Sequence, residues 1–137
     1  MSQEGIAEAL PAHVLDASAL LAFLHGEVGA NMVGPLLSRS VLSSVNWAEV
    51  LQKVIAQGSR EVHDVREELG SLRLRILPFT AEDAESTAVL WPSTRQAGLS
   101  LGDRACLSLA QRLGLPALTT DRVWAALDLG IEVRLIR

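Results

Sequence analysis

The chain has 137 residues, of which 49% are hydrophobic and 20% are charged, a composition typical of one globular domain and unlike that of disordered proteins. Its formal net charge of -4 argues against a generally basic surface for nucleic acid, although carboxylates that hold metal ions also add to a negative total. The single cysteine, Cys106, excludes an internal disulfide and lies in an apolar helical run, where we expect a core residue. The sequence has no run of about 18 apolar residues and does not begin like a secretion leader, so we expect a cytoplasmic protein with no membrane partner. We also expect a single domain over residues 1–137.

The first half of the chain alternates short apolar runs with helical periodicity. Residues 13–15 are predicted to form a strand that leads into a helix ending near residue 24. Glycines at 26, 29 and 34 interrupt the next helical segment, and a second strand is expected at 41–42. Two amphipathic helices, 46–57 and 61–69, precede a third strand within 72–77.

The second half continues the alternation. Thr80 is predicted to open a helix that runs to about Leu90 and is stopped by Trp91-Pro92. A helix at 103–113, a strand at 116–119, a helix at 122–129 and a strand at 131–136 follow. Strands that alternate with helices imply parallel pairing and right-handed crossovers. We therefore predict an α/β protein, a three-layer α/β/α sandwich around a mainly parallel sheet of about five strands.

Four carboxylates lie at predicted helix starts near the carboxyl ends of these strands. They are Asp16, Glu49, Asp103 and Asp121. Functional residues of parallel sheets gather at this edge, and hard cations such as Mg²⁺ bind through a few carboxylates, waters and substrate phosphates. Convergence of the four would predict a divalent-metal site suited to phosphodiester hydrolysis. The three histidines have no spacing that indicates a zinc site or a catalytic base with an orienting partner.

Each of these acids also has a purely structural interpretation. Asn46 followed by Glu49, and Ser100 followed by Asp103, fit helix capping boxes. Asp16 and Asp121 are in positions typical of N-caps. Taken singly, Glu49, Asp103 and Asp121 are more often caps than metal ligands, whereas the position of Asp16 after a buried strand fits a cap and a functional residue equally.

Other conspicuous side chains have structural interpretations as well. The acids at 82, 83 and 85 are predicted to form a solvated face or to favour the first turn of their helix. Trp47 and Trp124 are expected in the core. Arg104 and Arg122, which each follow a candidate ligand, would either contact phosphate or be solvated.

Four segments together carry a resemblance to a known family. They are Val14-Leu15-Asp16-Ala17-Ser18-Ala19-Leu20, Asn46-Trp47-Ala48-Glu49-Val50, Leu101-Gly102-Asp103-Arg104-Ala105-Cys106-Leu107 and Leu118-Thr119-Thr120-Asp121-Arg122-Val123-Trp124. In this order and spacing they resemble the motifs of PIN-domain ribonucleases, particularly the VapC toxins of bacterial toxin-antitoxin pairs. The resemblance covers nearly the whole chain.

The resemblance implies a site, a cofactor and partners. Asp16, Glu49, Asp103 and Asp121 would be the catalytic residues that coordinate one or two Mg²⁺ or Mn²⁺ ions. Ser18, Asn46 and Thr119 would support them by orienting ligands or waters. The implied function is that of a metal-dependent endoribonuclease, a toxin that cleaves single-stranded RNA, forms a homodimer and is blocked by a cognate antitoxin protein. Residues 28–37 and the helix 61–69 are the expected partner surface.

Three alternatives remain open from the sequence. A PIN nuclease for RNA maturation, with no antitoxin, would have the same residues. A phosphotransfer module also gathers acids around Mg²⁺, but Ser18 stands where a phosphatase would have a second aspartate, and the only lysine, Lys53, does not follow the last strand as a receiver domain requires. A non-catalytic interaction module would use the acids only as caps.

Overall fold

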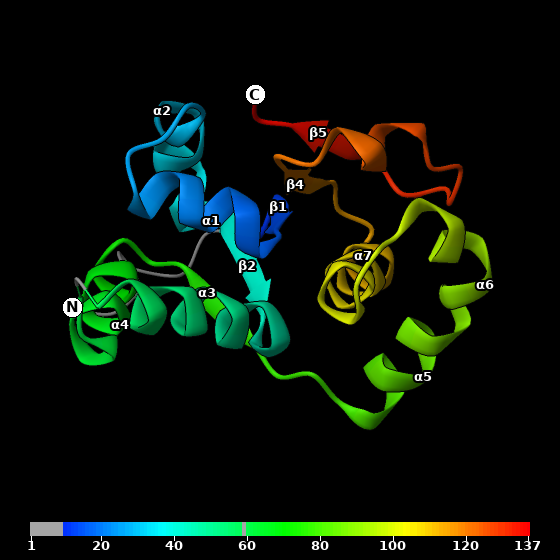
Figure 1. Ribbon diagram of the computed structural model, residues 1–137, viewed down its shortest axis with the longest axis horizontal. Helices are drawn as coiled ribbons and strands as arrows, with labels where there is room; N and C mark the ends of the chain where they lie inside the picture. Colours follow the sequence, from blue (N-terminus) through cyan, green and yellow to red (C-terminus); the bar gives the residue numbers. More distant parts are fainter. Residues whose placement is uncertain (1–9, 59) are drawn as a thin grey trace.

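The computed structural model describes residues 10–58 and 60–137, so that residues 1–9 and 59 of the predicted domain lie outside the described residues. Five strands form one sheet in the order β3-β2-β1-β4-β5 (Figure 1), and every neighbouring pair is parallel. The strands are β1 (His13–Leu15), β2 (Ser40–Ser43), β3 (Arg75–Leu77), β4 (Ala117–Thr119) and β5 (Val133–Leu135). The predicted α/β architecture with a parallel five-stranded sheet is confirmed.

Helical segments connect the strands and cover both faces of the sheet. Before β3 these are α1 (Ala17–Leu24), α2 (Ala30–Val33), the 3-10 helix η2 (Gly34–Arg39), α3 (Ser44–Gln57) and α4 (Val62–Ser71). After β3 they are α5 (Ala81–Val89), α6 (Trp91–Thr94), η3 (Arg95–Ala97), α7 (Leu101–Leu113) and η4 (Arg122–Ala126). No helix in the described part of the chain is long and apolar enough to cross a membrane.

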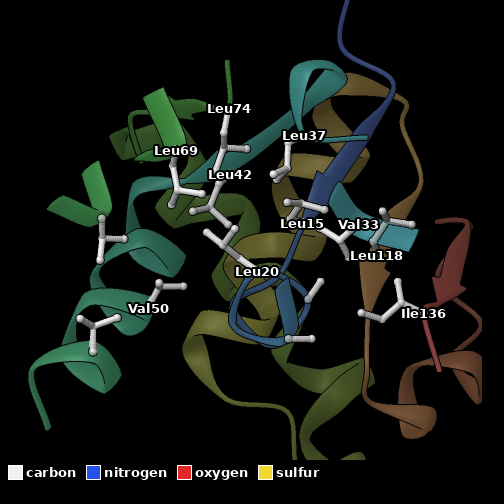
Figure 2. Close-up of a cluster of buried hydrophobic side chains, with 14 residues drawn as sticks. Leu15, Leu20, Val33, Leu37, Leu42, Val50, Leu69, Leu74, Leu118 and Ile136 are labelled. Atoms are coloured by element: carbon white, nitrogen blue, oxygen red, sulfur yellow. The ribbon is translucent and has the colours of Figure 1, made fainter. Parts of the chain in front are cut away.

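Alternating side chains on the strands divide the interior into two cores. Leu15, Leu42 and Leu118 point into a core with side chains from α1 to α4 (Figure 2). Their strand neighbours, among them Val14 and Val41, point to the other face and pack with α7 and the fully buried Trp124. This is the expected result of the two-residue period of a strand that is buried on both faces.

Chain direction across the sheet sets the location of the site. From the central β1 the chain adds β2 and β3 on one side, then returns to place β4 and β5 on the other. The connections therefore leave the carboxyl ends of β1 and β4 in opposite directions, and such a switch point opens a crevice. The register pairs Leu15 with Leu118, so Asp16 and Thr119 emerge side by side at this crevice.

Several local predictions differ from the structure. Trp91-Pro92 does end α5, but it also begins another helical turn, α6, because proline fits the first turn of a helix, where its missing N–H costs nothing. The predicted helix 122–129 is only the 3-10 helix Arg122–Ala126.

Asp83 lies in the first turn of α5, which was one of the two predictions for these acids, but it is not part of a solvated face, which was the other. Its side chain is only 6% exposed. It closes a capping box with Thr80 and accepts a hydrogen bond from Arg112 Nε of α7 at 2.9 Å. Although burial opposes it, these hydrogen bonds and the Arg112 charge hold the pKa of Asp83 below its usual value. The acid thus ties α5 to α7, a role that only the tertiary partner Arg112 reveals.

Candidate metal-binding active site

The structure brings the four candidate carboxylates to one cavity of about 220 Å³. Asp16 comes from the end of β1, Glu49 from α3, Asp103 from the first turn of α7, and Asp121 from the loop after β4. The other residues that line the cavity are Ala17, Ser18, Leu21 and Lys53. Acids that are far apart in the sequence therefore meet at the crevice between β1 and β4.

Asp16 is the most buried of the four carboxylates, with 4% of its surface exposed. Burial raises its pKa to about 6, against the opposing effect of hydrogen bonds from Thr119, Ala19 and Ser18, and the nearby charge of Asp103 adds to the rise. The Ala19 N–H donates to Oδ1 at 2.8 Å, so Asp16 is also the N-cap of α1. A carboxylate desolvated in this way favours a neighbouring cation.

Ser18, in the first turn of α1, and Thr119, at the end of β4, orient Asp16. The Ser18 hydroxyl donates to Oδ1 at 2.7 Å, and the Thr119 hydroxyl donates to Oδ2 at 2.5 Å. Each hydroxyl also accepts a backbone N–H, Ser18 from Thr120 and Thr119 from Asp121, both at 3.0 Å. Because each hydroxyl accepts a backbone N–H on one side and donates to Asp16 on the other, the carboxylate is held in one orientation between α1 and β4.

Glu49 is held by Asn46 and by the absence of a side chain at position 102. The Asn46 amide nitrogen donates to Glu49 Oε1 at 2.8 Å and to the Gly102 carbonyl at 2.9 Å. The capping-box interpretation of Asn46 and Glu49 is wrong, because α3 begins earlier, with Ser43 as its N-cap. Asn46 lies inside the helix and instead links α3 to the start of α7.

Gly102 was not singled out by the sequence, yet the site depends on its size. A Cβ atom at this position would lie 2.5 Å from the carboxyl carbon of Glu49, closer than packed atoms approach. Only glycine lets the Glu49 carboxylate rest against the first turn of α7. Sequence periodicity contains no signal for such a contact, because it joins two helices that lie far apart in the sequence.

Asp103 and Asp121 are helix caps and also line the cavity. The Ser100 N–H donates to Asp103 Oδ2 at 2.9 Å, which completes the predicted capping box. The Val123 N–H donates to Asp121 Oδ1 at 3.0 Å. The structural and functional interpretations are therefore compatible, because a cap uses one carboxylate oxygen and leaves the other available.

Of two basic residues near these acids, one lines the cavity and the other binds a neighbouring helix. Lys53, the one lysine of the chain, lies one helical turn after Glu49 and lines the cavity, a placement that the i, i+4 spacing could have indicated. Arg104 donates instead to the Thr87 carbonyl at 3.1 Å, away from the cavity. The sequence predicted that Arg104 would either contact phosphate or be solvated. Both predictions are wrong, because its guanidinium instead links α7 to the carbonyl of Thr87 in α5.

Cys106 lies beneath the acids and is fully buried, as predicted for a core residue. Burial raises the pKa of its thiol well above the usual value, and the charges of Asp16, Asp103 and Glu49 raise it further. A thiol under these conditions stays protonated and is neither a nucleophile nor a metal ligand.

The donor atoms of the cavity suit a hard divalent cation. In the described part of the chain, Glu49 Oε2, Asp103 Oδ1 and Asp121 Oδ2 accept no hydrogen bond from the protein, so each presents a free oxygen. Oxygen-only donors are the ligands that hard cations such as Mg²⁺ or Mn²⁺ prefer, whereas zinc sites usually include His or Cys. Still, no group of three or more His, Cys, Asp or Glu among the described residues is arranged closely enough to hold a metal as it stands. The acids form a cavity, not a completed coordination sphere.

Replacing Gly102 with Ala is expected to weaken Mn²⁺ binding about tenfold, because the new Cβ displaces the Glu49 carboxylate. Alanine suits a helix better than glycine does, so the fold should be preserved. Calorimetric titration with Mn²⁺ measures the effect. Gly70→Ala is the matched control, since a Cβ on this α4 glycine meets no atom within 4 Å. If both variants and the unaltered protein bind Mn²⁺ with equal affinity, Glu49 is not a ligand of the metal.

An acidic crevice at the switch point of a parallel sheet places the molecule among the α/β proteins that bind ligands at the carboxyl ends of their strands. The chain belongs to the PIN-domain family, whose domain matches residues 13–129. PIN domains are a family of nucleases that typically depend on metal ions. The search of curated proteins gave no match.

Solved structures with the same fold include those of VapBC toxin-antitoxin systems. A toxin-antitoxin complex from Klebsiella pneumoniae is 22% identical with a TM-score of 0.71, and the match covers 92% of this chain and 98% of that chain. VapBC2 from Rickettsia felis bound to a promoter DNA fragment is 17% identical with a TM-score of 0.69, covering 90% and 98%. DNA-bound VapBC from Salmonella typhimurium is 18% identical with a TM-score of 0.65, covering 93% and 100%. At these identities the similarity concerns the fold.

Proposed function

We propose that the protein is a Mg²⁺- or Mn²⁺-dependent endoribonuclease that cleaves single-stranded RNA and is the toxin of a toxin-antitoxin pair. The observation that carries the proposal is the convergence of Asp16, Glu49, Asp103 and Asp121 on one cavity at the switch point of the sheet. Caps alone do not require this convergence, because each would stabilise its own helix wherever that helix lay.

The four acids would hold the metal, and the residues around them would maintain its geometry. When bound, a divalent ion supplies a water of lowered pKa and stabilises negative charge on phosphate oxygens. Asp16 would be the rigid ligand, because Ser18 and Thr119 fix its carboxylate. Asn46 sets the distance between Glu49 and α7. Lys53, on the exposed rim, would attract the polyanionic substrate.

The antitoxin and homodimer parts of the proposal rest on family resemblance and on neighbours that were solved as toxin-antitoxin complexes. A cavity formed by Trp47, Arg66, Leu69, Gly70, Leu74 and Ile76 supports α4 as a partner surface. The other predicted partner segment, 28–37, is partly core, since Val33 and Leu37 are buried, whereas Val28 and Met32 are exposed. Only the exposed side chains of that segment would contact a partner.

Purified protein is expected to cleave single-stranded RNA when Mg²⁺ or Mn²⁺ is present and to stop when EDTA is added. Asp103→Asn should lower the rate by on the order of 100-fold or more, because it removes a ligand charge while Asn can still accept the Ser100 N–H of the capping box. Gel analysis of end-labelled RNA and of total RNA gives the rate and the cut sites. Metal-independent cleavage, or an unaffected Asp103→Asn variant, contradicts the proposal.

A further inference from the structure

A second cavity adjoins the acidic one and has two arginines on its wall. It has a volume of about 620 Å³ and is lined by Val28, Thr120, Asp121, Arg122 and Arg137. Asp121 lines both cavities, so they meet at this residue. Val28, which is 74% exposed, gives the second cavity an apolar wall. A ligand over the four carboxylates would therefore reach the second cavity without crossing the protein interior.

Arg122 is the principal charge of this second cavity. Among the described residues it has no hydrogen bond and no ion pair, so its guanidinium is free to bind a ligand. The Asp121 side chain accepts the Val123 N–H and fixes the backbone on both sides of Arg122. The metal-site acid and the free arginine are thus consecutive residues that face adjoining cavities.

Arg137 approaches the same cavity from the segment after β5. Its Nη1 donates to the Val28 carbonyl at 3.2 Å and lies 3.4 Å from Glu27 Oε1, so this guanidinium is already anchored and part of its charge is offset. We expect it to contribute less than Arg122. The guanidinium is planar, always charged and able to bind two oxygens of one phosphate.

The charge distribution identifies the ligand class. The chain has a net charge of -4 and four carboxylates in the neighbouring cavity, so a polyanion gains little attraction from the surface as a whole. The arginine pair provides local positive charge beside the acids. A single strand with a phosphate over the acids presents its next phosphates at short, regular intervals, and the adjoining cavity would receive one of them.

We propose that this Arg122–Arg137 cavity is a phosphate subsite that binds a phosphodiester of single-stranded RNA next to the one that is cleaved. This inference rests on the proposed ribonuclease function. It assigns the register of the strand on the protein: one phosphate at the four carboxylates and a neighbouring one between the two arginines, with Thr120 at the cavity wall.

The binding test uses fluorescein-labelled single-stranded RNA and fluorescence anisotropy, in an Asp16→Asn background so that the RNA stays intact. Arg122→Ala should raise Kd about tenfold and lower the magnitude of the salt slope by about one, and Arg137→Ala should raise Kd about threefold. Arg39→Ala is the charge-matched control, because Arg39 is exposed and directly precedes β2, at the edge of the sheet opposite the carboxyl ends of the strands. It should stay within about twofold of the parent.

A second measurement locates the phosphate. RNA oligonucleotides that each carry one neutral methylphosphonate linkage, at successive distances from the cut, are cleaved by the Asp16-containing protein and by its Arg122→Ala variant. At one position beside the cut the neutral linkage should slow the unaltered protein about tenfold and have little effect on the variant, because the partner guanidinium is already missing.

The outcomes separate the two levels of the proposal. If the unaltered protein neither binds nor cleaves RNA, the ribonuclease function is wrong and the subsite with it. If it cleaves RNA while Arg122→Ala and Arg137→Ala bind as tightly as Arg39→Ala, the function stands and the subsite is overturned. Loss of binding in both arginine variants with no position-specific methylphosphonate effect also overturns it, since that result indicates general attraction of RNA instead of one bound phosphate.

Discussion

Replacing Asp16 with Asn is expected to abolish metal-dependent RNA cleavage, with a loss on the order of 1000-fold or more, while the protein remains folded. The substitution removes the one candidate ligand whose carboxylate is both buried and fixed by neighbouring hydroxyls. Asn keeps an oxygen that accepts the Ala19 N–H, so the N-cap of α1 survives. The measurement is the cleavage rate of single-stranded RNA at saturating Mn²⁺, together with circular dichroism of the variant.

Asp64→Asn is the control for Asp16→Asn, because Asp64 is an exposed carboxylate in the first turn of α4. It removes the same charge from the molecule and should cleave at the rate of the unaltered protein. Mn²⁺ should raise the melting temperature of the control and leave that of Asp16→Asn unchanged. Cleavage by Asp16→Asn would place the chemistry elsewhere.

Without metal, the free energy of unfolding is expected to fall by about 3 kcal/mol as the pH rises from about 4 to beyond 6. Burial raises the folded-state pKa of Asp16 from 3.8 to about 6, a difference of about 2 units at about 1.4 kcal/mol each. The pKa of Asp16 is higher in the folded protein than in the unfolded chain, so the protonated carboxyl favours the folded state. This contribution to the free energy of unfolding is complete below pH 4 and is lost as the pH rises through about 6. A protonated Asp16 is compatible with burial, whereas an ionised one is not.

Urea unfolding in EDTA at several pH values, for the unaltered protein and for Asp16→Asn, isolates this contribution. The lowered pKa of Asp83 acts in the opposite direction, since its stabilisation is lost as the pH falls, but it is common to both proteins and cancels in their difference. Above pH 6 the metal-free variant should be the more stable of the two, and Mn²⁺ should reverse the order. Parallel pH profiles would show that Asp16 is not desolvated in solution.

The acids of the site illustrate why a sequence pattern alone leaves their role open. Asp16, Asp103 and Asp121 were each explained equally well as helix caps, and each is a cap. A cap needs one acceptor oxygen near the first turn of its own helix, which is a local property. Lining a common cavity depends on where three helix starts lie relative to one another, and that is set by the order of the strands.

Interactions between distant segments were the ones that could not be predicted. The Asn46 contact with Gly102, the partnership of Asp83 with Arg112 and the turn of Arg104 toward Thr87 all join elements far apart in the chain. A polar residue in an amphipathic pattern is assigned to solvent by default, because solvation is its usual fate. Such a residue is buried instead when a specific partner from another element binds it, and the local sequence pattern gives no information about that partner.

The sequence by itself determined the succession of strands and helices, the parallel α/β class and the motif residues, since these follow from local periodicity, capping chemistry and short contiguous segments. The tertiary structure alone decided the strand order with β1 at the centre, the meeting of the four carboxylates and the adjoining arginine cavity. The physical reason is the range of the interactions. Hydrogen bonds within a helix turn and the alternation of a strand are fixed by neighbours in the chain, whereas desolvation, cavity shape and charge proximity depend on distances that only folding creates.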